Sequence, residues 1–418
     1  MPRGVVLDTM RDPSTPEDVE ITAEAREPVW DPTLGILVDV DRAGQPVNRL
    51  VTIGDSLTHG FQSFAIYNTD LSYPAIIAHE LGWGDAFRYP TYQGYGGLPL
   101  NLEMLARTLE RDFGDEIDWW ELPLALFTVR TFMDQVEDWW ERGPGSVVPN
   151  VAGINHNLGI YGWDLRDTLS KTADTCRAEL AKPTNQAFRQ IVENANERAA
   201  IRVLESARDK RGNALTPLGA ARALGEQGTI QRVEGDDGKG DGIETLIVFL
   251  GSNNALKTIT ELKVVWSAEG YDDPSRKERF TVWRPTHFQQ ELDEIVAEVR
   301  QIKARHVIWC TVPHVTIAPI ARGVDVKVRP ESRYFPFYTR VWIRDSDFDH
   351  KDDPNITAQQ TRAIDSAIDQ YNDAITAAVR AARKDGRDWY LYDICGLLDR
   401  VAARRYIDSL AARPDWWS

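Results

Sequence analysis

The chain alternates short apolar runs with longer stretches of helical periodicity, most clearly in its C-terminal half. Apolar runs of strand length, the profile of a buried parallel strand, occur at residues 47–53, 244–250, 306–312 and 389–392. Stripes of apolar residues at helical spacing occupy residues 286–302 and 357–383. Strands separated by crossovers of this length pair in parallel. The sequence therefore predicts a three-layer α/β/α doubly wound domain with a mainly parallel sheet.

The two predicted helices share a start signal. Thr286 stands three residues before Gln289, and Thr357 stands three residues before Gln360. In a capping box, a Thr side chain accepts a hydrogen bond from the backbone three residues on, and the Gln there bonds back to the Thr backbone. We therefore expect each of these helices to be capped by its Thr.

Composition limits the class of protein. The 418 residues suffice for one large or two ordinary domains, with a core that needs no disulfide or metal. The 42% hydrophobic and 27% charged residues are typical of globular proteins. The 48 Lys and Arg against 64 Asp and Glu give a net charge of −16, which argues against binding a phosphate backbone. Nucleic acid is therefore not an expected partner.

Cysteine spacing and hydropathy set further limits. Cys176, Cys310 and Cys395 form no C-x-x-C pair, so neither a disulfide framework nor a metal site is predicted. The longest aliphatic and aromatic run, residues 246–250, is far shorter than the roughly 20 residues that cross a bilayer. The N-terminal residues lack the apolar region of a signal peptide. We therefore expect no membrane span and no cofactor, and a cytoplasmic location by default.

Three regions differ in pattern. Residues 1–46 are rich in Pro, Asp and Glu without sustained periodicity, which predicts an extended N-terminal arm across the domain surface. Residues 47–418 are expected to form the main domain. Within it, residues 61–150 form a large insertion with Trp-Trp doublets at 119–120 and 139–140. Most tryptophans are core or partly buried anchors, but binding loops are carried on a rigid scaffold, so this insertion is the candidate substrate-selecting region.

A serine lies just after the first predicted strand. Residues 54–60 read Gly-Asp-Ser-Leu-Thr-His-Gly and contain Ser56. A Ser at a strand-to-helix turn exposes its hydroxyl at the carboxyl edge of the sheet, where a helix N-terminus favours developing negative charge. Ser is also among the commonest N-cap residues of helices. Position alone therefore leaves two interpretations of Ser56, a nucleophile or a helix cap.

Two further segments contain the residue types of an oxyanion site. Residues 157–165 read N-L-G-I-Y-G-W-D-L and contain Gly162, where the lack of a Cβ lets a backbone N–H approach a ligand. Residues 251–254 read G-S-N-N, follow the strand at 244–250 and contain Asn253. A side-chain amide can donate to an oxyanion but cannot accept a proton. Taken separately, an ordinary turn glycine and an Asx-turn explain these residues as well. Their order and placement favour one common site.

Together the three segments resemble the conserved blocks of the GDSL, or SGNH, hydrolase family, over about residues 47–400. The resemblance implies that Ser56 is the nucleophile. It also implies that the Ser56 N–H, the Gly162 N–H and the Asn253 side chain form an oxyanion hole. Residues 47–418 are accordingly expected to be an SGNH-hydrolase-like domain.

The chain departs from the family pattern in two places. Asn254 occupies the position of the usual aspartate, and we expect its amide to hold the turn by hydrogen bonding. The family carries its base in a D-x-x-H block near the C-terminus, whereas no histidine follows His350 here. Asp347 and His350 have that spacing but precede the predicted helix at 357–383. His314, just past a strand end, is the other candidate, and the remaining five histidines are not expected to be the base.

The resemblance implies a serine hydrolase of carboxylic esters. Ser56 would lose its proton to a histidine and attack the acyl carbonyl, and water would cleave the acyl-enzyme. The alternative is a non-catalytic or truncated scaffold that binds acyl or sugar ligands without turnover, because the D-x-x-H block is absent. The expected partner is a small-molecule ester, and three residues are expected at the substrate: Asp55, Asn254 and His314.

Overall fold

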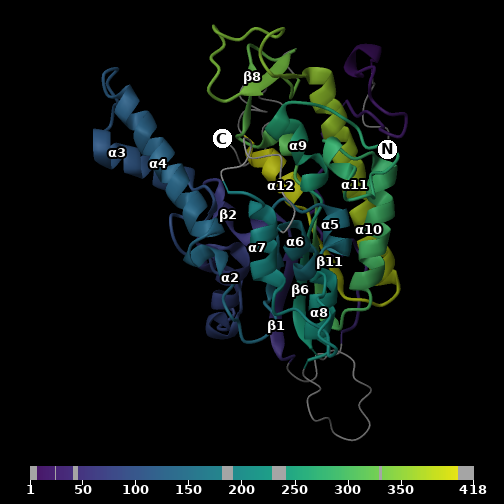
Figure 1. Cartoon of the computed structure of the whole chain (residues 1–418). Helices are drawn as coiled ribbons and strands as arrows, with labels where there is room; N and C mark the ends of the chain where they lie inside the picture. The colour runs from purple at the N-terminus through teal and green to yellow at the C-terminus, as the bar shows by residue number, and fades with distance from the viewer. Residues whose placement is uncertain are drawn as a thin grey trace, which may run out of the picture.

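A five-stranded parallel sheet lies at the centre of the molecule (Figure 1). The structure is a computed structural model, and it describes residues 7–23, 25–40, 46–180, 192–227, 242–328 and 332–402. In spatial order the strands are β11 (Trp389–Tyr392), β7 (Ala304–Cys310), β6 (Ile243–Phe249), β1 (Asn48–Gly54) and β5 (Asn157–Gly159). Every neighbouring pair in this sheet is parallel, so the predicted α/β class with a parallel sheet is confirmed.

The strand order identifies where a ligand would bind. Numbered as they occur along the chain, the five strands lie in the order 2-1-3-4-5. The direction of winding reverses between β1 and β6, and in open α/β sheets ligands bind beside the carboxyl ends of the strands at such a switch point. The segments that follow β1 and β6 are therefore the first places to look for a site.

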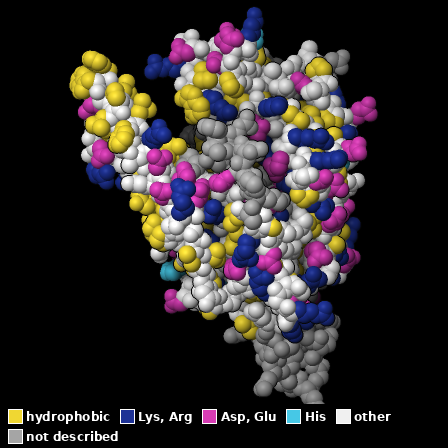
Figure 2. Space-filling model, viewed as in Figure 1, with side chains coloured by type: hydrophobic (Ala, Val, Ile, Leu, Met, Phe, Trp, Pro, Cys, Tyr) yellow, Lys and Arg dark blue, Asp and Glu magenta, His cyan; other side chains and the backbone are white. Residues whose placement is uncertain are grey.

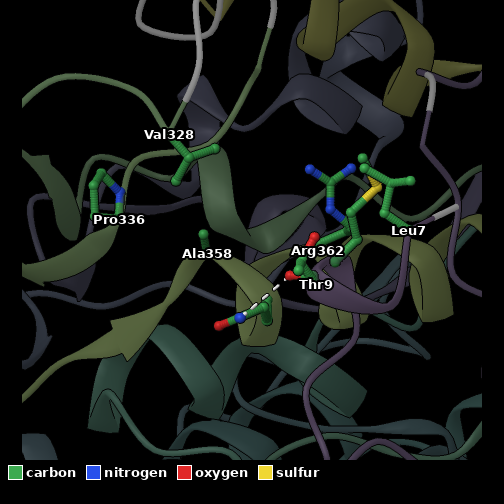
Figure 3. Close-up of a pocket in the computed structure, with 8 residues that line it drawn as sticks. Leu7, Thr9, Val328, Pro336, Ala358 and Arg362 are labelled. Carbon is green, nitrogen blue, oxygen red and sulfur yellow. Dashed lines mark hydrogen bonds between the residues drawn. The ribbon is translucent and has the colours of Figure 1, made fainter.

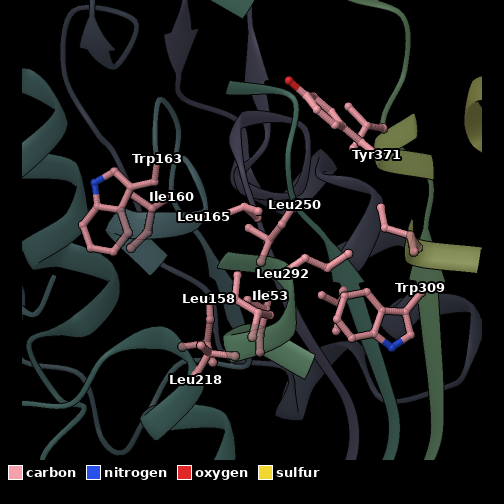
Figure 4. Packing of buried hydrophobic residues seen from close by; sticks show 14 of the residues in the cluster. Ile53, Leu158, Ile160, Trp163, Leu165, Leu218, Leu250, Leu292, Trp309 and Tyr371 are labelled. Atoms are coloured by element: carbon pink, nitrogen blue, oxygen red, sulfur yellow. The ribbon is translucent and has the colours of Figure 1, made fainter. Parts of the chain in front are cut away.

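Helices cover both faces of the sheet, because successive strand residues point to opposite sides. On one face, Ile53 and Leu158 belong to one buried cluster with Leu218 and Leu292 (Figure 4). A separate cluster on the other face joins residues of β1, β6 and β7 to residues 73–78 and Ile394. The sheet is thus a middle layer between two layers of helices.

The described helices vary from one turn to seven turns. None of them combines the length and the apolar content needed to cross a bilayer. Their bounds are α1 (Ser56–His59), α2 (Tyr73–Glu80), α3 (Leu102–Phe113), α4 (Leu122–Glu141), α5 (Leu165–Ser170), α6 (Ala173–Leu180), α7 (Ala195–Leu204), α8 (Pro217–Gly225), α9 (Asn253–Glu261), α10 (Pro285–Val299), α11 (Ala358–Lys384) and α12 (Ile394–Val401).

The segment that connects β1 to β5 contributes to a second, smaller core. Tyr92, Leu98, Phe132 and Trp140 are buried together there. Beyond this core, α3 and α4 form a hairpin that projects from the body of the molecule (Figure 1). Two small antiparallel sheets complete the described strands: β2 (Phe61–Gln62), β3 (Ala65–Ile66) and β4 (Leu98–Pro99), and β8 (Ala321–Val324), β9 (Phe337–Arg340) and β10 (Ile356–Thr357).

The described N-terminal residues run across the helices on one side of the domain. The Glu20 N–H donates to Gln370 Oε1 of α11 at 2.9 Å. Arg26 forms a buried ion pair with Asp393 at 2.7 Å, just after β11. The Leu391 N–H of β11 donates to the Pro32 carbonyl at 2.9 Å. This arm therefore ties the edge strand and the longest helix together.

One of the two predicted capping boxes is confirmed. At α11, the Gln360 N–H donates to Thr357 Oγ1 at 3.3 Å, and the Thr357 N–H donates to Gln360 Oε1 at 3.0 Å. The capping box predicted at Thr286 is wrong, because α10 already begins at Pro285. Proline is favoured at the first helical position, where its missing N–H has no helical partner to lose. The Thr286 hydroxyl instead donates to Asp18 of the N-terminal arm at 2.7 Å.

Candidate active site

The three sequence segments lie at one edge of the sheet. Gly54 at the end of β1 is in register with Gly159 of β5 and with Phe249 of β6. The three strands are parallel neighbours, so they end at the same level and their following loops are adjacent. These loops carry the predicted catalytic residues Ser56, Gly162 and Asn253.

Ser56 is the first residue of the short helix α1. The cap of this helix is Asp55, whose Oδ1 accepts a hydrogen bond from the Leu57 N–H at 3.2 Å. The Ser56 side chain is partly exposed. The interpretation of Ser56 as the helix cap is therefore wrong, and its hydroxyl has no part in starting the helix.

Two glycines allow α1 to sit directly on the strand ends. A Cβ on Gly54 would collide with the Thr58 side chain. A Cβ on Gly159 would lie 2.7 Å from the His59 backbone nitrogen, closer than such atoms approach. Only glycine permits this contact, and the contact fixes the height of Ser56 above the sheet.

Asn253 joins the second and third segments. It is the first residue of α9, and its Nδ2 donates to the Trp163 carbonyl at 2.8 Å. Gly162, the residue before Trp163, is exposed and has a φ of +77°, in the left-handed region that favours glycine. An amide has two N–H bonds, and this contact engages one of them.

His59 joins the first and second segments. Its Nδ1 accepts a hydrogen bond from the Tyr161 N–H at 3.2 Å, so the neutral ring carries its proton on Nε2, which donates to the Tyr92 hydroxyl at 2.8 Å. The ring is fully buried, and burial lowers the pKa of His59 to about 3. A histidine held neutral with both nitrogens occupied positions the Gly162 loop rather than serving Ser56 as a base.

A buried lysine binds two aspartates at the end of the second segment. Lys277 Nζ donates to Asp164 Oδ2 at 2.6 Å and to Asp167 Oδ2 at 2.8 Å. The two aspartates also form the capping box of α5, directly after the Gly162 loop. Sequence reasoning missed Lys277, because it lies 113 positions from Asp164 and no local pattern connects the two.

Asp55 and Asn254 lie beneath the surface loops, and both side chains are fully buried. Burial raises the pKa of Asp55 to about 6, against the opposing effect of a hydrogen bond from Ser252. Asn254 holds its turn through the backbone: its N–H donates to the Gly251 carbonyl, and its carbonyl accepts from the Trp283 N–H. Its amide has no hydrogen-bond partner within the described residues, so the expectation that the amide holds the turn is wrong. In this structure both residues are buried parts of the loops, and neither side chain is exposed.

His314 is buried among carboxylates. Its Nδ1 lies 2.9 Å from Asp399 Oδ2, and its Nε2 lies 3.3 Å from Asp369 Oδ1. Burial alone would lower the pKa of His314, but the negative charge of Asp399 and its neighbours outweighs burial and raises the pKa well above its ordinary value. The ring is therefore an imidazolium with both nitrogens facing carboxylates. It cannot take a proton from Ser56 in this arrangement.

The other histidines contact groups other than Ser56 or are exposed. His156 accepts from the Arg88 N–H at 2.8 Å, His287 lies 2.8 Å from the Ser267 hydroxyl, and His306 lies 2.6 Å from Asp388. His79 is exposed on α2, and His350 is exposed in the connection between β9 and β10. All seven histidines lie within the described residues, and none of them hydrogen-bonds to Ser56.

We expect His314→Ala to lower the free energy of unfolding by about 3–5 kcal/mol, because it removes a cation from between two buried carboxylates. Chemical denaturation measures this loss. The raised pKa fixes its pH dependence: the contribution of His314 is full below about pH 6.5, the ordinary value, and declines as the pH rises through the higher pKa of the folded state.

The exposed His79→Ala is the matched control and should leave stability unchanged. Turnover per folded molecule should stay the same in both variants, since neither ring serves Ser56. Equal stability of His314→Ala and the parent at pH 6 would show that the buried ion cluster is misread.

Three cavities in the described part of the chain lie away from these loops. The one in Figure 3, of about 400 Å³, lies between the N-terminal arm and the start of α11, where Gln359 donates to the Thr9 carbonyl. The others measure about 280 and 510 Å³. None of these three is lined by Ser56, Gly162 or Asn253. Within the same described ranges, no group of three or more His, Cys, Asp or Glu side chains could hold a metal ion.

Comparison with known proteins adds no assignment. No protein-family model matches the chain, and no curated protein or solved structure is significantly similar to it.

Proposed function

We propose that this chain is a serine hydrolase of carboxylic esters that works through an acyl-enzyme on Ser56, like the GDSL, or SGNH, hydrolases that its motifs resemble. One observation carries the proposal: the loops after β1, β5 and β6 meet at the switch point of the sheet. These loops carry a hydroxyl, a glycine backbone N–H and a side-chain amide in Ser56, Gly162 and Asn253. These are the groups that acyl transfer requires.

The proposed reaction has two steps. Ser56 Oγ attacks the acyl carbonyl as a base takes its proton, and the alcohol leaves with a proton from that base. The oxyanion is held by the Ser56 N–H, the Gly162 N–H and Asn253 Nδ2, each donor contributing on the order of 3 kcal/mol. Water then attacks the Ser56 ester, which releases the carboxylic acid and restores the hydroxyl.

A second candidate is a hydrolase scaffold that binds acyl or sugar ligands without turnover. The arrangement of the seven histidines favours it, since none of them hydrogen-bonds to Ser56. His314, the leading candidate base in the sequence, is enclosed by Asp399 and Asp369. The two functions differ in one property, the activation of Ser56.

Hydrolysis of p-nitrophenyl acetate separates the two functions. The hydrolase predicts turnover above the buffer rate, with a burst of up to one p-nitrophenol per molecule where deacylation limits the rate. The same protein unfolded in guanidinium chloride controls for the general reactivity of surface side chains. A folded protein no faster than the unfolded control would support the scaffold instead.

A further inference from the structure

The end of the α3–α4 hairpin carries an exposed group of large apolar side chains. Figure 1 shows the hairpin projecting from the body, and Figure 2 shows hydrophobic side chains gathered at its end. Trp119 is 77% exposed and Phe127 is 65% exposed. We call the following seven exposed residues the apolar tip: Ile117, Trp119, Trp120, Leu122, Leu124, Leu126 and Phe127. Such a patch marks an interaction site rather than an ordinary surface.

The apolar side chains point in many directions. Leu122, Leu124, Leu126 and Phe127 are exposed residues in the first two turns of α4. At 100° per residue they span about 200° of the helix circumference. Ala125, on the remaining arc, is buried, as expected for the side that meets α3. A one-sided protein contact needs an apolar stripe of roughly 100°, so the wider arc fits immersion in an apolar medium.

The charges around the tip identify the kind of medium. Residues 112–121 contain no Lys or Arg, and residues 122–129 contain no charged residue. Anionic membranes are recognised by clusters of Lys and Arg, which this segment lacks. Trp is suited to an interface between water and an apolar phase. Five carboxylates lie in the segment: Asp112, Asp115, Glu116, Asp118 and Glu121.

We infer that the apolar tip docks on the uncharged surface of aggregated, water-insoluble esters. The substrate class rests on the proposed function, whereas docking itself does not require catalysis by Ser56. Acidic residues beside the tip keep the protein off anionic surfaces by like-charge repulsion. The hairpin would thereby hold the protein at the surface where such esters are concentrated.

Flotation of protein with triolein droplets tests the inference. The assay uses Ser56→Ala as the parent, so that the droplets are not consumed. Adding Trp119→Ser and Trp120→Ser should lower partition to the droplets at least about tenfold, because two large apolar side chains no longer leave water. Adding Trp342→Ser, at a tryptophan 73% exposed in the β9–β10 connection, is the matched control and should change nothing. Including anionic phosphatidylglycerol in the droplets should weaken binding, most strongly at low salt.

Three results would overturn the inference: equal partition of the tip variant and the parent, tighter binding to anionic droplets, or a dimer in ultracentrifugation that the tip variant abolishes. The last would mean that a second copy covers the tip. Hydrolysis of soluble p-nitrophenyl acetate by the Trp119→Ser, Trp120→Ser protein with Ser56 intact separates this failure from failure of the proposed function. Turnover by this protein, together with equal partition of the Ser56→Ala parent and its tip variant, overturns docking alone. No turnover, together with flotation of the parent that the tip variant loses, overturns the hydrolase alone.

Discussion

Replacing Ser56 by alanine is expected to lower kcat for p-nitrophenyl esters by roughly 10⁴–10⁶-fold, because acyl transfer loses its nucleophile. The fold should be unaffected. Ser56 does not cap α1, which is the role of Asp55, and its side chain is partly exposed. Substitutions at such surface positions change stability by about 0.5 kcal/mol or less. Steady-state kinetics and thermal unfolding of the two proteins measure both quantities.

The exposed Ser170→Ala, at the end of α5, controls for the loss of a serine hydroxyl as such and should retain full activity. Retained turnover in Ser56→Ala would contradict the assignment. Residual activity within tenfold of the parent would place the nucleophile elsewhere, whatever the geometry of the loops.

Asn253→Ala is expected to lower kcat by roughly 10²–10³-fold, because an oxyanion donor acts chiefly in the transition state. Its loss also removes the hydrogen bond to the Trp163 carbonyl, which contributes about 1 kcal/mol to stability. Kinetics and chemical denaturation therefore report on two separate roles of one amide.

Asn253→Asp tests the N–H donor without changing the size of the side chain. The carboxylate keeps the size of the side chain but has no N–H to donate when ionised, so the loss of kcat should be at least as large. A fall in stability with unchanged kcat in Asn253→Ala would mean that the amide only ties the second and third loops together.

The sheet could be predicted from sequence because most of its strands have an apolar pattern that is visible within a few consecutive residues. Four of the five are short segments rich in apolar residues, such as residues 244–250, and each ends close to a glycine or a polar turn. β5 could not be predicted as a strand in this way, because Asn157–Gly159 is three residues long and contains only Leu158 as an apolar side chain. These residues form a strand because they pair with β1, and no apolar pattern in their own sequence indicates it.

The site could be predicted only in part. Ser56, Gly162 and Asn253 follow strands, so topology brings their loops to one edge. The partners that hold those loops come from distant positions. Lys277 and the imidazole of His59 act through contacts that no spacing rule describes.

The role of His314 could not be predicted from its position in the sequence either. Its position after β7 suggested a place at the substrate, but the helices α11 and α12 place Asp369 and Asp399 against its ring. Burial and pairing of this kind depend on tertiary packing. The exposed Trp119 and Trp120 illustrate the converse, since the ordinary expectation for tryptophan is a buried anchor.

The proposed function requires Ser56 to be an activated nucleophile. Treating the folded protein with a fluorophosphonate and mapping the adduct by peptide mass spectrometry tests this most directly, because the reagent modifies serines whose hydroxyl is activated. We expect a single adduct on Ser56 that disappears when the protein is unfolded before treatment. An unmodified Ser56 in the folded protein, or an adduct on a different serine, would contradict it.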